Sequence, residues 1–470
     1  MKRKVYTRYL KTIADLISPV GVYAALRDRF PHSLLLESAD YHDRSDSKSF
    51  ICLNAIAGFE ATKKRVQIQF PGEEASHFQA TNHKEVLDSY RSFLSSFSAV
   101  ENDLPFNSSG LFGYSSFEAV QYMEDIEMNN PEGIMEGNPD MKYQLFEYIL
   151  VFDHFKNELY ITQNSIDQEL DNNKSLETLR SLLRLQNYPG FNFSKEGQES
   201  SNLEEGEFME NVSKGIQHCL RGDVFQLVLS RRFQQKFTGD DFNVYRSLRS
   251  INPSPYLFYF DYGDFKIMGS SPEAQLQVSN GMATINPIAG TVLRSRYASE
   301  DVERANALKN NPKENAEHVM LVDLARNDLS KNSDQVNVDV YAEIQYFSHV
   351  IHMVSRVSGQ LNKEVKGIDI YADTFPAGTL SGAPKYRALE IINETEKTTR
   401  SLYGGAIGFM GFDGSINHAI IIRSILSKNK TLNYQAGAGI VAHSSPQGEL
   451  QEVYNKVAAL RKAIHLAETL

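Results

Sequence analysis

Residues 435–460 read QAGAGIVAHSSPQGELQEVYNKVAAL, and this stretch joins two kinds of secondary structure. QAGAGIVA is apolar and contains two glycines, a pattern typical of a strand that a ligand or another backbone approaches closely. Ser445 and Pro446 fit the N-cap and the first position of a long final helix. The stretch therefore predicts a fold of mixed strands and helices, and the flanking segments repeat the mixture.

Strand-like and helix-like segments occur throughout the chain. Residues 406–442 look like a meander of three strands, and YQLFEYILVFDHFKNELYITQ looks like a hairpin. PKENAEHVMLVDLARNDLS has helical spacing with a proline near its first turn. The polar segment 188–206 lacks apolar periodicity, which predicts a surface linker between an N-terminal half, residues 1–187, and a second half, residues 207–470.

The composition narrows the class of protein. The chain has 470 residues, 41% of them apolar, which is enough for a large core. Its formal net charge of −11 argues against binding of a nucleic-acid backbone. No apolar run has the length of a membrane span, and the basic N-terminus lacks the apolar run of a signal peptide. The two cysteines, Cys52 and Cys219, are too few for a disulfide framework, so we expect a reduced, cytoplasmic protein.

Two pairs of glutamates lie near the starts of predicted helices. Glu314 and Glu317 are three positions apart and share a helix face, and Glu449 and Glu452 repeat that spacing on the final helix. Lys456 lies one turn further along the same face. An all-oxygen set of this kind suits Mg²⁺. Glutamates near a helix N-terminus more often interact with the helix dipole at a solvated surface, so spacing alone leaves both interpretations open.

Other residues also have two interpretations on local pattern alone. Gly437 and Gly439 either let backbone N–H groups approach an anion or mark a bulged strand. Arg423, in the apolar run AIIIRSIL of a predicted central strand, either binds a carboxylate or faces outward. His352 is either a proton-transfer group or a satisfied core residue. The same choice between ligand binding and packing applies to Gly290, Thr291, Thr379 and Tyr403.

Taken together, the motifs resemble those of the chorismate-utilising enzymes. GDVFQLVLSRRF, SSPEAQL, PIAGT, DTFPAGTLSGAPK, YGGAIGF and INHAIIIRS precede the stretch quoted above in the order and spacing of that family. The series covers nearly all of residues 204–465, and it most resembles the branch called anthranilate synthase component I. The resemblance implies an α+β fold in which two large antiparallel β-sheets pack as a sandwich with helices on the outside.

The resemblance also implies a set of functional residues. Mg²⁺ would be bound directly by Glu317 and Glu452, and through water by Glu314 and Glu449. The substrate-binding positions would be Gly290, Thr291, Tyr403, Arg423, Gly437 and Gly439. The catalytic positions would be His352, Thr379, Gln226 and Lys456.

Two positions separate the branches of this family. Ala289 stands where relatives that make aminodeoxychorismate carry a lysine that can attack the ring. Gln226 stands where isochorismate and salicylate synthases carry a lysine that activates water. Because neither amine is present, the resemblance predicts that ammonia adds to the ring and that pyruvate then leaves, which gives anthranilate. Two alternatives stay open: aminodeoxychorismate synthase component I, and a catalytically silent regulatory subunit that binds an amino acid.

Nothing in the chain resembles a glutamine amidotransferase domain. The resemblance therefore implies a separate glutaminase subunit, assembled with this chain as a heterotetramer, that supplies ammonia from glutamine. It also implies feedback inhibition by tryptophan. The matching effector positions are Glu37, Ser38, Asn252, Pro253, Pro255, Tyr256 and Phe258.

Overall fold

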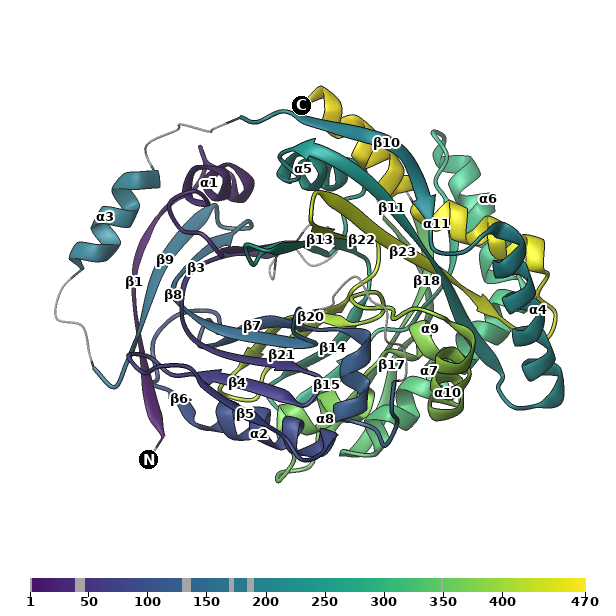
Figure 1. Ribbon diagram of the computed structural model, residues 1–470, viewed down its shortest axis with the longest axis horizontal. Helices are drawn as coiled ribbons and strands as arrows, with labels where there is room; N and C mark the ends of the chain where they lie inside the picture. The colour runs from purple at the N-terminus through teal and green to yellow at the C-terminus, as the bar shows by residue number, and fades with distance from the viewer. Residues whose placement is uncertain (1, 39–46, 129–136, 169–172, 184–189, 348–349) are drawn as a thin grey trace.

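The computed structural model describes residues 2–38, 47–128, 137–168, 173–183, 190–347 and 350–470. Two layers of mainly antiparallel strands face each other, and helices cover the outside (Figure 1). The layers are hydrogen bonded to each other, because β2 (Leu34–Glu37) pairs with β12 (Tyr256–Asp261) and with β3 (Lys48–Thr62). The predicted α+β fold is confirmed, and its two layers form one continuous hydrogen-bonded system.

One layer is built mainly by the second half of the chain. In hydrogen-bonded order it contains β10 (Phe193–Ser201), β11 (Gln226–Gly239), β23 (Thr431–Ile440), β22 (Ser424–Lys428) and β13 (Phe265–Ser271). The presence of β10 corrects the prediction of a linker over residues 188–206, although residues 188 and 189 lie outside the described part. Five of the nine β10 residues are exposed while its backbone pairs with β11, so its polar composition is that of a solvated edge strand.

The other layer combines both halves of the chain. In hydrogen-bonded order it contains β7 (Gly110–Ser115), β20 (Ala406–Gly411), β21 (Ile416–Ile420), β14 (Ala274–Ser279), β15 (Met282–Ile285) and β18 (Val350–Leu361). β16 (Ile288–Leu293) and β17 (Ser333–Tyr346) both pair with β18. Because β7 pairs with β20, the N-terminal half is part of the same sheet as the strands that surround the candidate site.

The predicted meander over residues 406–442 is wrong in its second strand. That run divides into β21 and β22, because Arg423 has a φ of 49°, which an L-residue rarely adopts. β21 pairs with β20 and β14, whereas β22 pairs with β13 and β23. The chain thus crosses from one layer to the other here, and Arg423 lies at the crossing rather than within a central strand.

Apolar side chains from both halves pack between the layers. Phe112 of β7, Phe258 of β12 and Ile407 of β20 belong to one buried cluster and are each no more than 2% exposed. Burial of a side chain of this size stabilises the fold by about 1.5–3 kcal/mol. This cluster therefore fixes the spacing of the layers.

The helices that carry the glutamate pairs begin at the prolines that were predicted to lie in their first turns. α7 (Pro312–Ser330) has Asn311 as N-cap, and α11 (Pro446–Leu466) has Ser445, whose Oγ accepts the Gly448 N–H at 3.2 Å. Both helices have proline in the first turn, which confirms the predicted start of each. Within the described ranges, no helix is long and apolar enough to cross a membrane.

Candidate active site

The two predicted glutamate pairs come together from α7 and α11. Burial raises the pKa of Glu317, and the neighbouring carboxylates of Glu314 and Glu452 raise it further. Burial and then the charge of Glu452 likewise raise the pKa of Glu449. The carboxylates of the two helices are therefore close enough to repel one another, and a cation between them would relieve that repulsion.

The burial of Glu449 and its unpartnered carboxylate oxygen also fit a cation site. Glu449 is 4% exposed, and its Oε2 has no hydrogen-bond partner in the described part of the chain. Such an atom is costly to bury unless a cation or a proton compensates it. Glu452 is paired with Lys456 Nζ at 2.7 Å. As the described side chains stand, no group of three or more His, Cys, Asp or Glu is arranged to hold a metal, so binding would require these glutamates to turn toward a common point.

Gln226, the first residue of β11, contacts the acidic cluster, which consists of Glu314, Glu317, Glu449 and Glu452. Its Nε2 donates to Glu317 Oε1 at 3.1 Å, while its Oε1 is buried and has no partner among the described residues. A Cβ on Gly439 of β23 would lie 2.7 Å from Gln226 Nε2, so glycine is needed there for the amide to occupy this position. The arrangement presents one free acceptor oxygen beside the glutamates.

The strands β16 and β18 place His352 in a hydrogen-bonded unit. His352 Nδ1 lies 3.0 Å from Thr291 Oγ1 and 3.1 Å from the carbonyl oxygen of Gly290. The carbonyl can only accept, so this geometry assigns the ring proton to Nδ1. Burial lowers the pKa of His352 to about 4, and its buried Nε2 has no partner in the described chain. The imidazole is therefore neutral near pH 7 and offers Nε2 as a proton acceptor.

Gly290 and Gly437 connect these elements to the acidic cluster. A Cβ on Gly290 would lie 2.9 Å from Glu314 Oε2, and one on Gly437 would lie 2.8 Å from Tyr403 Oη. Lys456 Nζ donates to the Gly437 carbonyl at 2.8 Å. Burial raises the pKa of Tyr403, so its hydroxyl stays protonated and can donate to an anion. The structure thus brings Gly290, Gly437 and Tyr403, three of the six predicted substrate positions, close to the glutamate pairs.

Sequence reasoning missed Glu273, which lies next to Thr379. Thr379 Oγ1 donates to Glu273 Oε1 at 3.2 Å, and burial raises the pKa of Glu273 to about 8 despite that bond and the nearby cations. Near pH 7 this carboxyl is therefore protonated and can act as a proton donor. The available signal was a glutamate between the apolar residues of SSPEAQL, a motif already quoted for the resemblance.

Arg423 is a second cationic side chain of the site, in addition to Lys456. Burial lowers its pKa, and the charge of Glu273 partly offsets that effect, so the two side chains are near each other. Arg423 is partly exposed, and within the described chain the charge of Glu273 is the one side-chain interaction that acts on its guanidinium. A partly buried guanidinium with free donors is suited to bind a carboxylate in a two-pronged manner.

A separate cavity of about 900 Å³ lies between the layers, and five of the seven predicted effector residues line it. These are Glu37, Ser38, Pro255, Tyr256 and Phe258. Glu37 is 5% exposed and accepts from Tyr245 Oη at 2.7 Å and from Arg249 Nε at 2.9 Å. Asn252 and Pro253 are not among the described lining residues, and the Asn252 amide instead donates to Ser270 Oγ at 3.2 Å.

Comparison with known proteins matches nearly the whole chain. A model of the chorismate binding enzyme family matches residues 5–462. Anthranilate synthase component 1 of Aquifex aeolicus (strain VF5) is 34% identical, over 98% of this chain and 94% of that protein. The protein of the same name from Neisseria gonorrhoeae is 38% identical, over 97% and 94%. The crystal structure of anthranilate synthase component I from Streptococcus pneumoniae TIGR4 is 32% identical, with a TM-score of 0.78 over 96% of this chain and 99% of that one.

Proposed function

The chain belongs to the chorismate binding enzyme family, and from this premise we propose that it converts chorismate and ammonia to anthranilate and pyruvate, the first step of tryptophan biosynthesis. The similarity to anthranilate synthase component 1 proteins along nearly the whole chain supports this reaction. The observation that carries the choice of nucleophile is Gln226, whose unpartnered Oε1 lies beside the glutamates. An amide oxygen can accept an N–H of ammonia but cannot deprotonate water.

We propose that Glu314, Glu317, Glu449 and Glu452 hold a Mg²⁺ ion. Their mutual repulsion and the unpartnered Oε2 of Glu449 fit a hard dication, and oxygen ligands are those that Mg²⁺ prefers. When bound, the ion would draw electron density toward the ring carboxylate of chorismate, which helps the distant hydroxyl to leave.

The protein's own residues bind the substrate, orient ammonia and transfer protons. Arg423 and Tyr403 donate to the substrate carboxylates, and Gln226 orients ammonia toward the ring carbon beside the carboxylate-bearing carbon. Protonated Glu273 gives its proton to the departing hydroxyl, which leaves as water. His352 Nε2 then accepts the proton of the ring carbon that carries the new amine, while the ring C–O bond to the enolpyruvyl group breaks. The ring becomes aromatic, and the departing enolpyruvate takes up a proton at its methylene carbon to become pyruvate.

A fluorescence assay tests this function. We expect purified protein with chorismate, Mg²⁺ and ammonium at alkaline pH to produce the fluorescence of anthranilate. Accumulation of a non-fluorescent amino-chorismate would instead indicate aminodeoxychorismate synthase. No turnover at all would indicate the silent regulatory subunit.

Replacement of Gln226 tests its role in selecting ammonia. Gln226→Lys places an ammonium group beside Glu317 and removes the free acceptor, so we expect ammonia-dependent anthranilate formation to fall by roughly 100-fold. Product analysis should then show some isochorismate from addition of water. The matched control is Gln234→Lys on the same strand, where the amide donates to Asn433 at 2.9 Å. Wild-type ammonia activity in Gln226→Lys would refute the role.

We propose that a separate glutamine amidotransferase subunit supplies ammonia, in a heterotetramer with this chain. Cys52 and Cys219 are both free and buried, and burial raises the pKa of each thiol. Neither is therefore an activated nucleophile for glutamine. With this chain alone, glutamine should not replace ammonium as the nitrogen source.

We propose that the cavity between the layers binds tryptophan as an inhibitor. Pro255, Tyr256 and Phe258 supply an apolar wall for the indole ring, and Glu37 supplies a carboxylate for the ammonium group. Isothermal titration should show binding, and Glu37→Gln should weaken it by about tenfold or more through loss of a charged hydrogen bond. Glu60→Gln, on β3, serves as the control. Absence of tryptophan binding to the wild type would refute the proposal.

A further inference from the structure

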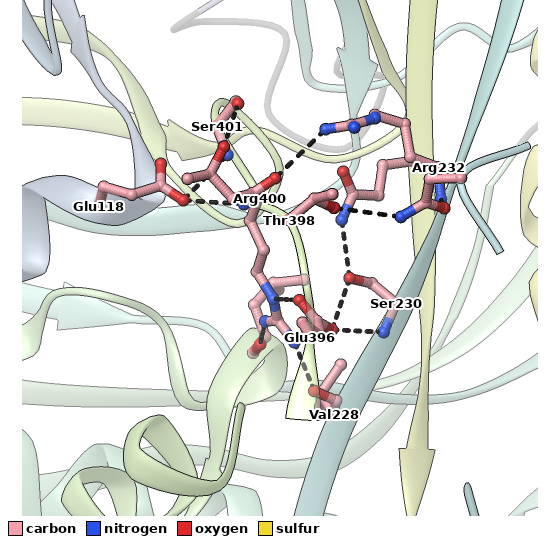
Figure 2. Close-up of polar contacts among 12 residues, drawn as sticks. Glu118, Val228, Ser230, Arg232, Glu396, Thr398, Arg400 and Ser401 are labelled. Carbon is pink, nitrogen blue, oxygen red and sulfur yellow. Dashed lines mark hydrogen bonds and ion pairs between the residues drawn. The ribbon is translucent and has the colours of Figure 1, made fainter. Parts of the chain in front are cut away.

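A buried polar network joins the elements that carry Gln226, Thr379 and Tyr403 (Figure 2). Its centre is Arg400, which is 2% exposed and lies between α10 (Lys385–Thr395) and β20. Arg400 Nε pairs with Glu396 Oε2 at 2.8 Å, just after the end of α10. Neither residue lies in the acidic cluster, so their role must act through the segments that they hold.

The guanidinium of Arg400 bonds two of these elements directly. Its Nη1 donates to the carbonyl oxygen of Leu380 at 2.7 Å, in α9 (Gly378–Ser381), one residue after Thr379. Its Nη2 donates to the carbonyl oxygen of Val228 at 2.6 Å, on β11, two residues after Gln226. Because the guanidinium is a rigid planar fork, these bonds fix α9 and β11 relative to each other.

Glu396 extends the network along β11. Its Oε1 accepts the backbone N–H and the Oγ–H of Ser230, both at 2.8 Å, as well as Arg400 Nη2 at 2.8 Å. In the register of β11 with β23, Val228 is opposite Gly439 and Ser230 is opposite Gly437. The ion pair is therefore attached to the pair of strands that presents both glycines to the site.

The turn that carries Tyr403 is held by the same network. The carbonyl oxygen of Arg400 accepts the Tyr403 N–H at 3.2 Å. Glu118, from the 3₁₀ helix Phe117–Tyr122 of the N-terminal half, accepts the N–H groups of Arg400 at 2.8 Å and Ser401 at 3.1 Å. Ser401 has a φ of 57°, so the turn requires such bonds to keep its shape.

A buried ion pair is a poor source of net stability, because the cost of removing two charges from water offsets their attraction. The network is better explained by the elements that it joins. We infer that Arg400, together with Glu396, is a positioning residue for the proposed chorismate reaction. It holds Thr379, Tyr403 and Gln226 in the relative placement that the chemistry requires, and in this sense the inference rests on the proposed function.

Arg400→Lys is the most informative variant. Lysine keeps the charge, but its three donors on one nitrogen cannot replace the four bonds that the guanidinium makes to Glu396, Leu380 and Val228. We expect kcat/KM for chorismate to fall by about 100-fold, the scale of a displacement near 1 Å in a catalytic site. The matched control is Arg27→Lys, since Arg27 is also largely buried and ion-paired, with Asp240, away from the site elements. Arg27→Lys keeps the charge beside Asp240 and contacts none of the site elements, so its kcat/KM should stay within about twofold of the wild type.

A double-mutant cycle separates positioning from general destabilisation. If Arg400 acts through the Tyr403 turn, Arg400→Lys combined with Tyr403→Phe should lose much less activity than the product of the two single losses. Arg27→Lys combined with Tyr403→Phe should lose the full product. Glu396→Gln keeps the shape of the side chain but removes the charge that pairs with Arg400. Combined with Tyr403→Phe, it should show the same less-than-multiplicative loss of activity, which tests the network even if Arg400→Lys does not fold.

The inference is overturned if Arg400→Lys and Glu396→Gln retain wild-type kcat/KM, or if all cycles multiply. If the wild type makes no anthranilate, the proposed function fails separately, and chorismate binding becomes the readout. Titration calorimetry with Mg²⁺ should then show about tenfold weaker chorismate binding in Arg400→Lys, on the scale of one charged hydrogen bond, but not in Arg27→Lys. Equal affinities in the two variants would overturn the inference.

Discussion

Glu317→Gln is expected to reduce anthranilate formation by about 10³-fold or more, because loss of a metal ligand removes several kcal/mol of charge stabilisation. The charges of both Glu314 and Glu452 raise the pKa of Glu317, so Glu317 lies where the two pairs meet. Steady-state kinetics over a range of Mg²⁺ concentrations measures the effect. The control is Glu210→Gln, an exposed glutamate of α4 (Glu205–Arg221).

The same substitution should not destabilise the metal-free protein. Burial and like charges raise the pKa of Glu317 in the folded state, so its ionised form is disfavoured by folding. Stability is therefore lost as pH rises from the unfolded pKa toward the folded one, and the amide removes that loss. By calorimetry in EDTA, Glu317→Gln should melt at the wild-type temperature or above it. Added Mg²⁺ should raise the melting temperature of the wild type only, and normal turnover in the variant would refute the metal assignment.

Glu273→Gln is expected to lower kcat by about 10³-fold, within the range of a lost general acid. The amide keeps the bond from Thr379 but cannot supply a proton to the leaving hydroxyl. Because burial raises the pKa of Glu273 to about 8, wild-type kcat/KM for chorismate, measured at a fixed concentration of free NH₃, should decline above that pH as the carboxyl ionises. The residual activity of the variant should lack this decline, and an unchanged pH profile would contradict the role of Glu273.

The raised pKa of Glu273 also predicts that the stability of the fold depends on pH. The folded protein keeps a proton that the unfolded chain releases at the ordinary pKa of glutamate, so the free energy of unfolding falls as pH rises toward about 8. Glu273→Gln lacks this contribution. The melting temperature of the variant relative to the wild type should therefore increase between pH 5 and pH 8.

Local features of the fold could be predicted from the sequence. The starts of α7 and α11 follow from capping residues and prolines that act on the next turn of backbone. The polar edge strand β10 was mistaken for a linker, because its pairing with β11 and the ion pair of Glu199 with Arg461 join residues far apart in the sequence. The break at Arg423 was missed because its left-handed backbone is imposed by the crossing between layers.

In the candidate site, too, features that depend on contacts between distant parts of the chain could not be predicted from local sequence. Spacing placed Glu314 with Glu317 and Glu449 with Glu452, but only the packing of the chain shows that the two pairs repel each other. The protonated state of Glu273 depends on burial, which no spacing reveals. The Arg400 network was missed for a similar reason, since its partners come from β11, α9 and the N-terminal half (Figure 2).

The central claim is that this site adds ammonia to chorismate and releases pyruvate. Mass spectrometry after incubation with chorismate, Mg²⁺ and ¹⁵N-ammonium tests it most directly. The prediction is anthranilate that carries the ¹⁵N label, with an equal amount of pyruvate. Formation of isochorismate, or of a labelled amino-chorismate without pyruvate, would contradict the claim.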